Sequence, residues 1–225
     1  MKKSPSLILV PTPIGNRGDI TLRALEILRT VGTILAEDTR KSGLLLKHYG
    51  IKASLQSFHI FNEHKETDKI ISRMSAGENF ALITDAGTPS ISDPGFLLVR
   101  ACLVAKLEIE CLPGPTALIP ALVKSGFPSD RFVFEGFLPH KKGKQTLLKQ
   151  IAEEEKTTII YESPNRLLKT LTQMKEHFGE NRQISVSREL TKIYEETITA
   201  PLCEVIEYFS QHKIKGEVII VVHGK

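Results

Sequence analysis

The fold of this chain is decided by one stretch, Phe80-Ala81-Leu82-Ile83-Thr84-Asp85-Ala86-Gly87-Thr88-Pro89-Ser90-Ile91-Ser92-Asp93-Pro94-Gly95. Its first five residues are apolar or β-branched, which predicts a buried strand over 80–84. The residues after that strand are rich in Gly, Pro and small polar side chains. In open parallel sheets, ligands bind at the carboxyl ends of the strands, so this loop is a candidate ligand site.

Two more loops of the same composition follow predicted strands. Pro11-Thr12-Pro13-Ile14-Gly15-Asn16 comes after the apolar run 7–10, and Pro113-Gly114-Pro115-Thr116-Ala117 comes after 108–112. Proline fixes the backbone in advance, and glycine lets the backbone approach a ligand closely. A single loop of this kind is explained as a rigid turn. Three of them after successive strands indicate a site whose backbone groups read adenine, ribose or an amino-acid moiety.

Strands and helices alternate along the chain, which predicts parallel strands and right-handed crossovers in the first half. Besides a helix capped by Asp19 or Thr21, we expect helices at 44–49, 68–74, 96–106, 116–124, 146–155, 165–178 and 202–210. The further strands are expected at 34–36, 157–161, 183–187, around Thr197 and at 217–223. The alternation breaks near 126–144, in a segment of Phe, Gly, Pro and Lys. The sequence therefore predicts two α/β domains, 1–120 and 141–225, joined by a linker at 121–140.

Composition is that of a globular protein: 225 residues, 41% hydrophobic, 25% charged and a net charge of +4. No apolar run reaches the roughly 18 residues that span a bilayer, so we expect a cytoplasmic protein without a membrane partner. The three cysteines show no disulfide or zinc-ligand spacing. His59, Glu63 and His64 do not share a helical face. We therefore expect no metal.

The common nucleotide and hydrolase motifs are missing. Gly15 and Gly18 do not form the dinucleotide motif GxGxxG, and Gln145 stands where a Walker loop needs Ser or Thr. Neither GxSxG nor HExxH occurs. The three Gly- and Pro-rich loops therefore remain as the candidate ligand site.

At these loops the sequence resembles the tetrapyrrole methylase superfamily, the class III S-adenosylmethionine-dependent methyltransferases. Within it, the sequence is similar to the ribosomal RNA small subunit methyltransferase I family. The resemblance runs from about Leu9 to Val222. Its motifs in the first half of the chain are Thr12-Pro13-Ile14-Gly15-Asn16, Asp19-Ile20-Thr21-Leu22, Ala36-Glu37-Asp38-Thr39-Arg40, Asp85-Ala86-Gly87-Thr88-Pro89, Ile91-Ser92-Asp93-Pro94-Gly95 and Pro113-Gly114-Pro115. Those in the second half are 131–139, Tyr161-Glu162-Ser163-Pro164 and Ser187-Arg188-Glu189-Leu190-Thr191-Lys192. Thr88, where the small-molecule branch usually has Asp, favours the RNA branch.

The resemblance implies two α/β domains with a cleft between them that holds the cofactor S-adenosyl-L-methionine. It implies 2′-O-methylation of a decoding-centre cytidine in 16S ribosomal RNA, with this RNA or the small ribosomal subunit as partner, and a homodimer. The cofactor-binding residues that it implies are Thr12, Pro13, Gly15, Asp85, Gly87, Thr88, Pro89, Ile91, Ser92, Pro113, Gly114, Thr116, Ala117, Tyr161 and Ser163. Asp85 could contact the cofactor directly or could hold the turn 87–91 in shape.

The reaction needs a ribose hydroxyl that loses its proton during attack. The catalytic candidates are Glu37, Asp38 and Arg40. Glu37 and Asp38 follow a strand and are candidate proton acceptors. The alternative is that they form an ion pair with Arg40 that only shapes the loop.

Cations near 131–150 and in the second half are candidates for binding phosphate. The RNA-binding candidates are Lys141, Lys142, Lys144, Arg166, Arg188 and Lys192. Structural ion pairs to nearby glutamates are the alternative for the last three. The sequence departs from the family pattern at Arg17 and at Ile60-Phe61, where the family more often has Glu-His, so the resemblance assigns no role to the loop 57–63. Tetrapyrrole methylation and a non-catalytic RNA-binding module remain the other functions.

Overall fold

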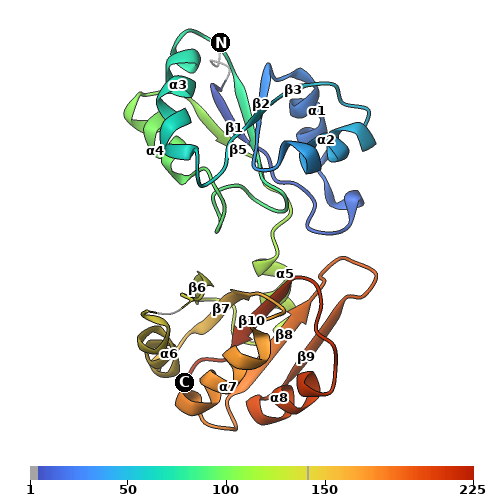
Figure 1. Ribbon diagram of the computed structural model, residues 1–225, viewed down its shortest axis with the longest axis vertical. Coiled ribbons are helices and arrows are strands. Elements are labelled where there is room, and N and C mark those ends of the chain that lie inside the picture. The colour runs from blue at the N-terminus through green and yellow to red at the C-terminus, as the bar shows by residue number, and fades with distance from the viewer. Residues whose placement is uncertain (1–4, 141) are drawn as a thin grey trace. The chain divides into compact units, whose positions relative to one another are not determined.

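A computed structural model describes residues 5–140 and 142–225, which fold into two compact units (Figure 1). The first unit ends at Thr116 and the second begins at Ala117. Each unit has one five-stranded sheet covered by helices. The α/β class predicted from the sequence is confirmed.

The sheet of the first unit is parallel throughout, in the order β3-β2-β4-β1-β5. Its strands are β1 (Leu7–Leu9), β2 (Thr33–Ala36), β3 (Ser54–Ser57), β4 (Phe80–Ile83) and β5 (Ile109–Cys111). Apolar side chains alternate between its two faces, as the pleat of a strand requires. Because all strands are parallel, their carboxyl ends lie along one edge.

Helices cover both faces of this sheet (Figure 1). The buried residues Ile8, Ile34 and Ala81 pack with α1 (Leu22–Thr30) and α2 (Thr39–His48). The opposite face, with Leu7, Leu35 and Leu82, packs with the second pair of helices. These helices are α3 (Glu63–Ser75) and α4 (Phe96–Val104). A short 3-10 helix, Arg17–Asp19, precedes α1.

The second unit has a mixed sheet, in the order β6-β7-β10-β8-β9. Its strands are β6 (Phe132–Phe137), β7 (Thr157–Glu162), β8 (Gln183–Arg188), β9 (Glu196–Pro201) and β10 (Val218–Val222). Within this second sheet, as far as the described residues show it, β6 and β7 pair in parallel and the other pairs are antiparallel. One face packs with α6 (Lys144–Glu153), α7 (Leu167–Phe178) and α8 (Leu202–Ser210), and α5 (Leu118–Ser125) packs on β8, β9 and β10.

The segment 121–140 differs from the linker that we expected. It lies within the second unit, where it forms most of α5 and the edge strand β6. Within this segment, the register of β6 shifts between Phe134 and Gly136, which marks a β-bulge. Bulges and glycines are tolerated at sheet edges, so a loop-like composition conceals a strand here.

Candidate functional site

Four loops meet at the carboxyl edge of the first sheet. They are the segments 10–16 after β1, 37–38 after β2, 84–95 after β4 and 112–116 after β5. The strands β2, β4, β1 and β5 are consecutive neighbours in the sheet, so the loops lie side by side. The three Gly- and Pro-rich loops found in the sequence are thus brought together, along with the catalytic candidates.

The three loops are locked to one another by hydrogen bonds. Thr12 and Gly87 form an antiparallel bridge in which each backbone N–H donates to the other's carbonyl at 2.9 Å. The buried Thr12 hydroxyl donates to the Thr84 carbonyl at 3.0 Å. Thr88 Oγ1 donates to the Pro115 carbonyl, also at 3.0 Å. Fixed loops of this kind lose little freedom when they bind a ligand, which favours affinity.

The loop 84–95 adopts a backbone that few residues tolerate. Ser90 and Ser92 have φ values of 72° and 61°, in the left-handed region that costs energy for residues other than glycine. Gly95 has φ 130°, and a Cβ there would lie 2.5 Å from Ser90 Oγ. The packing therefore requires glycine at 95. The same packing holds the loop 84–95 in a strained shape.

Polar atoms at the base of this loop lack partners. Within the described part of the chain, Thr84 Oγ1, Asp85 Oδ1 and Ser90 Oγ are buried and make no hydrogen bond. Buried polar atoms are nearly always paired, so such a cluster needs a ligand or water to satisfy it. A carboxylate oxygen and two hydroxyls suit a ligand that presents hydroxyl and ammonium groups.

Asp85 is paired in a way that the sequence did not suggest. Its Oδ2 accepts a hydrogen bond from Lys41 Nζ at 2.6 Å, from the first turn of α2. No hydrogen bond from the described turn 87–91 reaches this carboxylate. The loop is held instead by the Thr12 bridge and by the Thr88 hydroxyl, which leaves Oδ1 of Asp85 for a ligand.

Glu37 and Asp38 are neighbours with different environments. Burial and the nearby Asp85 charge raise the pKa of Glu37, whose Oε2 lies 3.5 Å from the Asp85 backbone nitrogen. The Arg40 guanidinium and the Arg40 N–H hold the pKa of Asp38 well below its usual range. Asp38 Oδ1 accepts from that N–H at 2.9 Å, and Oδ2 accepts from Arg40 Nη2 at 2.9 Å. The ion-pair alternative thus describes Asp38 and Arg40, and Glu37 is the stronger base.

The other cofactor candidates of the first unit lie in the same loops. Pro13 and Pro89 are buried and shape the backbone, whereas exposed positions could contact a ligand. These are Gly15, Ile91, Ser92, Pro113 and Gly114. A Cβ on Gly114 would lie 2.7 Å from Pro11, so this glycine lets the first and third loops approach. Thr116 and Ala117 are the residues at which the chain passes from one unit to the next.

In the second unit, Tyr161 and Ser163 flank a residue that the sequence analysis missed. Glu162 is buried at the end of β7 and accepts hydrogen bonds from the Ser163 N–H at 2.7 Å and from Thr170 Oγ1 at 2.6 Å. It also pairs with Arg166 at 2.6 Å. A carboxylate at the end of an otherwise apolar strand is a signal of such a role. Glu162 therefore fixes the loop that carries Ser163.

The RNA-binding candidates divide by exposure. Lys142 is exposed, and Lys141 lies outside the described residues. Lys144 differs from our expectation, because its ammonium is buried and donates to Thr170 Oγ1 at 2.8 Å. Burial lowers its pKa, and phosphate cannot reach it in this position.

The remaining three cations all have carboxylate partners. Arg166, Arg188 and Lys192 pair with Glu162, Glu196 and Glu189, respectively. The alternative that we considered for them was an ion pair to Glu189, Glu195 or Glu196, which describes Arg188 and Lys192, whereas Arg166 has a different partner. Their contact with phosphate stays a prediction.

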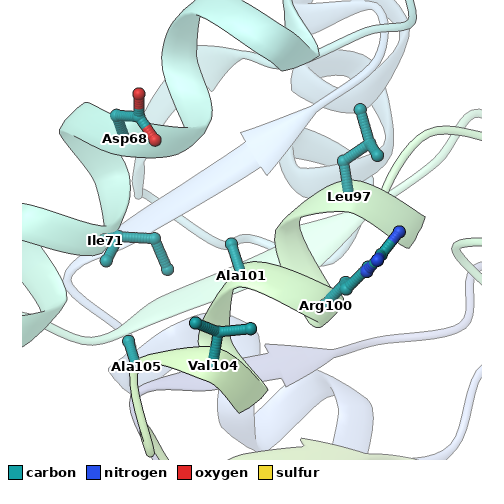
Figure 2. A pocket seen from close by; sticks show the side chains of 7 residues that line it. All are labelled: Asp68, Ile71, Leu97, Arg100, Ala101, Val104 and Ala105. Atoms are coloured by element: carbon teal, nitrogen blue, oxygen red, sulfur yellow. The ribbon is translucent and has the colours of Figure 1, made fainter.

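A further hollow, of about 390 Å³, lies away from the loops, between α3 and α4. Figure 2 shows Asp68 and Ile71 on one side of it and residues of α4 on the other, among them Arg100 and Val104. Its lining is mostly apolar, with Asp68 and Arg100 as the charged members, and the three interlocked loops take no part in it.

In residues 5–140 and 142–225, no three His, Cys, Asp or Glu side chains gather as metal ligands. Across the same residues, no helix combines the length and apolar character needed to span a membrane.

Comparison with known proteins gives consistent matches. The sequence matches the family described as Tetrapyrrole (Corrin/Porphyrin) Methylases over residues 6–206. A protein of Synechocystis sp. named Ribosomal RNA small subunit methyltransferase I is 50% identical over 219 residues, which cover 97% of this chain and 78% of that protein. Proteins of the same name from Escherichia coli O157:H7 and Thermotoga maritima are 48% and 44% identical, each over 97% of this chain and over 77% and 98% of the relative.

Solved structures share the fold at low sequence identity. The methyltransferase CobJ superposes with a TM-score of 0.72 at 16% identity, covering 98% of this chain and 95% of that one. Cobalt precorrin-4 methyltransferase CbiF gives 0.64 at 16% identity, covering 96% and 94%. At this identity the likeness establishes the fold alone.

Proposed function

This chain belongs to the tetrapyrrole (corrin/porphyrin) methylase family, and from that premise we propose that it methylates ribosomal RNA of the small subunit. It is a methyltransferase, as its relatives at 44–50% identity are named. The structural observation that carries the proposal is the set of three interlocked loops with unmet polar atoms at 84–90. The methyl donor that we propose is S-adenosyl-L-methionine.

The loops fit this donor. Its ribose hydroxyls and its ammonium group need acceptors, and Asp85 Oδ1 is buried without a partner among the described residues, as are the Thr84 and Ser90 hydroxyls of the same loop. Backbone N–H and C=O groups of the loops 12–16 and 113–116 are suited to the adenine edge. When bound, the donor supplies a methyl group on a positively charged sulfur. Lys41 Nζ donates to Asp85 Oδ2 and so fixes the orientation of this carboxylate.

We propose that the acceptor is the 2′-hydroxyl of a decoding-centre cytidine. A ribose hydroxyl attacks poorly unless a base takes its proton as the bond forms. Glu37 is placed for this at the end of β2, and its raised pKa makes it a better proton acceptor than Asp38. Asp38 caps α2 and holds Arg40.

Methylation of a tetrapyrrole is the competing function, since structural neighbours are named as a uroporphyrin-III-C-methyltransferase and a cobalt precorrin-4 methyltransferase. The relatives with much higher identity are named for ribosomal RNA, which favours RNA. We also propose cytoplasmic location, where ribosomes are, and pairing as a homodimer. Sedimentation of the purified protein tests the pairing.

The direct test uses methyl-labelled S-adenosylmethionine with three acceptors: small ribosomal subunits, their free RNA and a corrinoid precursor. We expect label in RNA, at a ribose oxygen, in at least one of the first two reactions. Label in the corrinoid alone would establish the competing function. Binding of the donor with no transfer to any acceptor would favour the non-catalytic module.

A further inference from the structure

The loop between β3 and α3 presents two large apolar side chains to solvent. Phe61 is 94% exposed and Ile60 is 68% exposed. An aromatic ring in water gains nothing for the fold, and an exposed aromatic beside a candidate reaction site is typical of a contact surface.

The loop is rigid at its start. Asn62 Oδ1 accepts from the His59 N–H at 2.8 Å, and Asn62 Nδ2 donates to the Ser57 carbonyl at 3.1 Å. The Phe61 N–H donates to His59 Nδ1 at 3.3 Å, and the two rings meet edge to face with centroids 6.0 Å apart. Phe61 is therefore held out from the protein by its own backbone.

The loop is equally fixed at its end. Glu63 is buried, and its Oε1 accepts from the N–H groups of Gly95 and Leu97 at 3.0 Å each. These N–H groups belong to the start of α4, directly after the loop 84–95. The segment 58–62, which carries Phe61, is thus connected through Glu63 to the candidate cofactor loop 84–95.

The segment 58–62 also lies next to Glu37, the proposed base. The Phe58 N–H donates to the carbonyl of Ala36 at 2.8 Å, and Ala36 directly precedes Glu37. Phe58 itself is fully buried, so this contact is fixed. His59 and Phe61 therefore emerge at the sheet edge beside the point at which Glu37 emerges.

Cations surround this edge. Arg40 and Lys41, in the first turn of α2, are paired with Asp38 and Asp85 but keep side chains 89% and 67% exposed, and Lys65 is exposed in the first turn of α3. Cations around an exposed aromatic match a nucleic acid strand, whose phosphates and bases alternate. They match a lipid tail or an apolar peptide less well.

We propose that Phe61 stacks on an unpaired base of the RNA substrate, next to the nucleotide that is methylated. This inference rests on the proposed function and adds a base contact to it. Proteins that act on single-stranded RNA hold splayed bases on aromatic faces. A base held at Phe61 would fix the neighbouring ribose relative to Glu37, which is the orientation that the transfer needs.

The chain has no tryptophan, so a single indole can report on this contact. In Phe61→Trp, we expect small ribosomal subunits or their single-stranded RNA to quench the fluorescence, and a duplex RNA to leave it unchanged. Val104→Trp is the matched control, because Val104 is 80% exposed at the far end of α4, away from the carboxyl edge. Its fluorescence should not respond.

Kinetics supply the second measurement. Phe61→Ala should raise the KM for the RNA substrate about 10- to 100-fold, the range expected for one lost stacking contact. The affinity for S-adenosylmethionine should not change. Phe61→Tyr should restore the KM and Phe61→Leu should not, because stacking needs an aromatic face. Val104→Ala should behave as wild type.

Three results would overturn the inference. If the KM of Phe61→Leu equals that of wild type, the contact needs no aromatic face and is either merely apolar or absent. If the fluorescence of Phe61→Trp does not change at saturating RNA concentrations, this residue does not stack on a base. Fluorescence that changes with protein concentration alone, together with altered sedimentation, would assign Phe61 to contact with a second copy. Lack of RNA methylation by the wild-type protein would instead refute the proposed function, and this inference with it.

Discussion

Lys41 Nζ lies 2.6 Å from Asp85 Oδ2 and so joins the first turn of α2 to the loop after β4. The pair leaves the other carboxylate oxygen, Oδ1, buried and without a partner among the described residues. Asp85 also lies close enough to Glu37 for its charge to raise the pKa of Glu37. The edge therefore holds one carboxylate suited to binding and another suited to accepting a proton.

Replacing Asp85 tests the binding role. Asp85→Asn should weaken S-adenosylmethionine binding by about 1–3 kcal/mol, the cost of losing a charged hydrogen-bond partner. The melting temperature should change little, because the loop is held by Thr12 and Thr88. Calorimetry and thermal unfolding measure the two effects. A drop in stability that matches the drop in affinity would show that Asp85 braces the loop instead.

If Glu37 is the base, it should set the acid limb of the reaction's pH profile. Its pKa is raised, so it is protonated and unable to accept a proton at the low end of the pH range. We expect kcat to fall as pH decreases, with a midpoint above the 4.5 of an ordinary glutamate. Glu37→Gln should lose most of its activity over the whole range. Asp38→Asn should keep the same acid limb, and a limb that moves in this variant instead would identify Asp38 as the base.

The same shift has a consequence for stability. A carboxyl group with a raised pKa binds its proton more tightly in the folded state, so the free energy of unfolding decreases as pH rises through that window. At neutral pH, ionised Glu37 therefore costs stability. Glu37→Gln should unfold at a higher urea concentration than wild type at pH 7 and should lose this advantage near pH 4. A variant less stable than wild type at pH 7 would contradict the burial of a charged Glu37.

The shape of the cofactor loop depends on Gly95. Gly95→Ala should destabilise the protein by about 2 kcal/mol or more, since it combines a positive φ with a contact at 2.5 Å. Gly50 is the matched control, with φ 66° and open space around its Cα. Gly50→Ala should cost only about 1 kcal/mol. Equal losses measured by urea unfolding would mean that the contact of Gly95 with Ser90 is unimportant.

Exposed and buried lysines of the segment 141–149 should respond differently. Changing the exposed Lys142 and Lys149 to Ala should lower the slope of log affinity against log salt by about one unit per lysine that binds phosphate. Lys144→Ala should leave this slope unchanged and lower the stability by about 1–3 kcal/mol, because it removes the buried hydrogen bond that Thr170 Oγ1 accepts from Lys144. A salt slope that falls only in Lys144→Ala would reverse this assignment.

The sequence predicted the part of the site that depends on strand order. The loops at 11–16, 85–95 and 113–117 each follow a parallel strand, so their meeting follows from topology. Periodicity did not reveal β3, whose side chains are exposed or half-buried at the sheet edge, or β6, which is bulged.

Side-chain pairing could not be predicted from spacing. Lys41 and Asp85 are far apart in sequence and meet only across α2 and β4. Lys144 sits in a run of lysines that reads as a basic surface, yet its register on α6 turns it inward toward Thr170. Such contacts depend on how a helix is rotated about its own axis, and this rotation cannot be read from the number of charged residues in a segment.

The most direct measurement of the central claim is a map of ribose methylation in small-subunit ribosomal RNA from cells with this gene, without it, and complemented with Glu37→Gln. The account predicts that one decoding-centre cytidine carries a 2′-O-methyl group only in cells with the wild-type gene. The Glu37→Gln cells should resemble the deletion strain. An identical methylation map in all three strains would contradict the account.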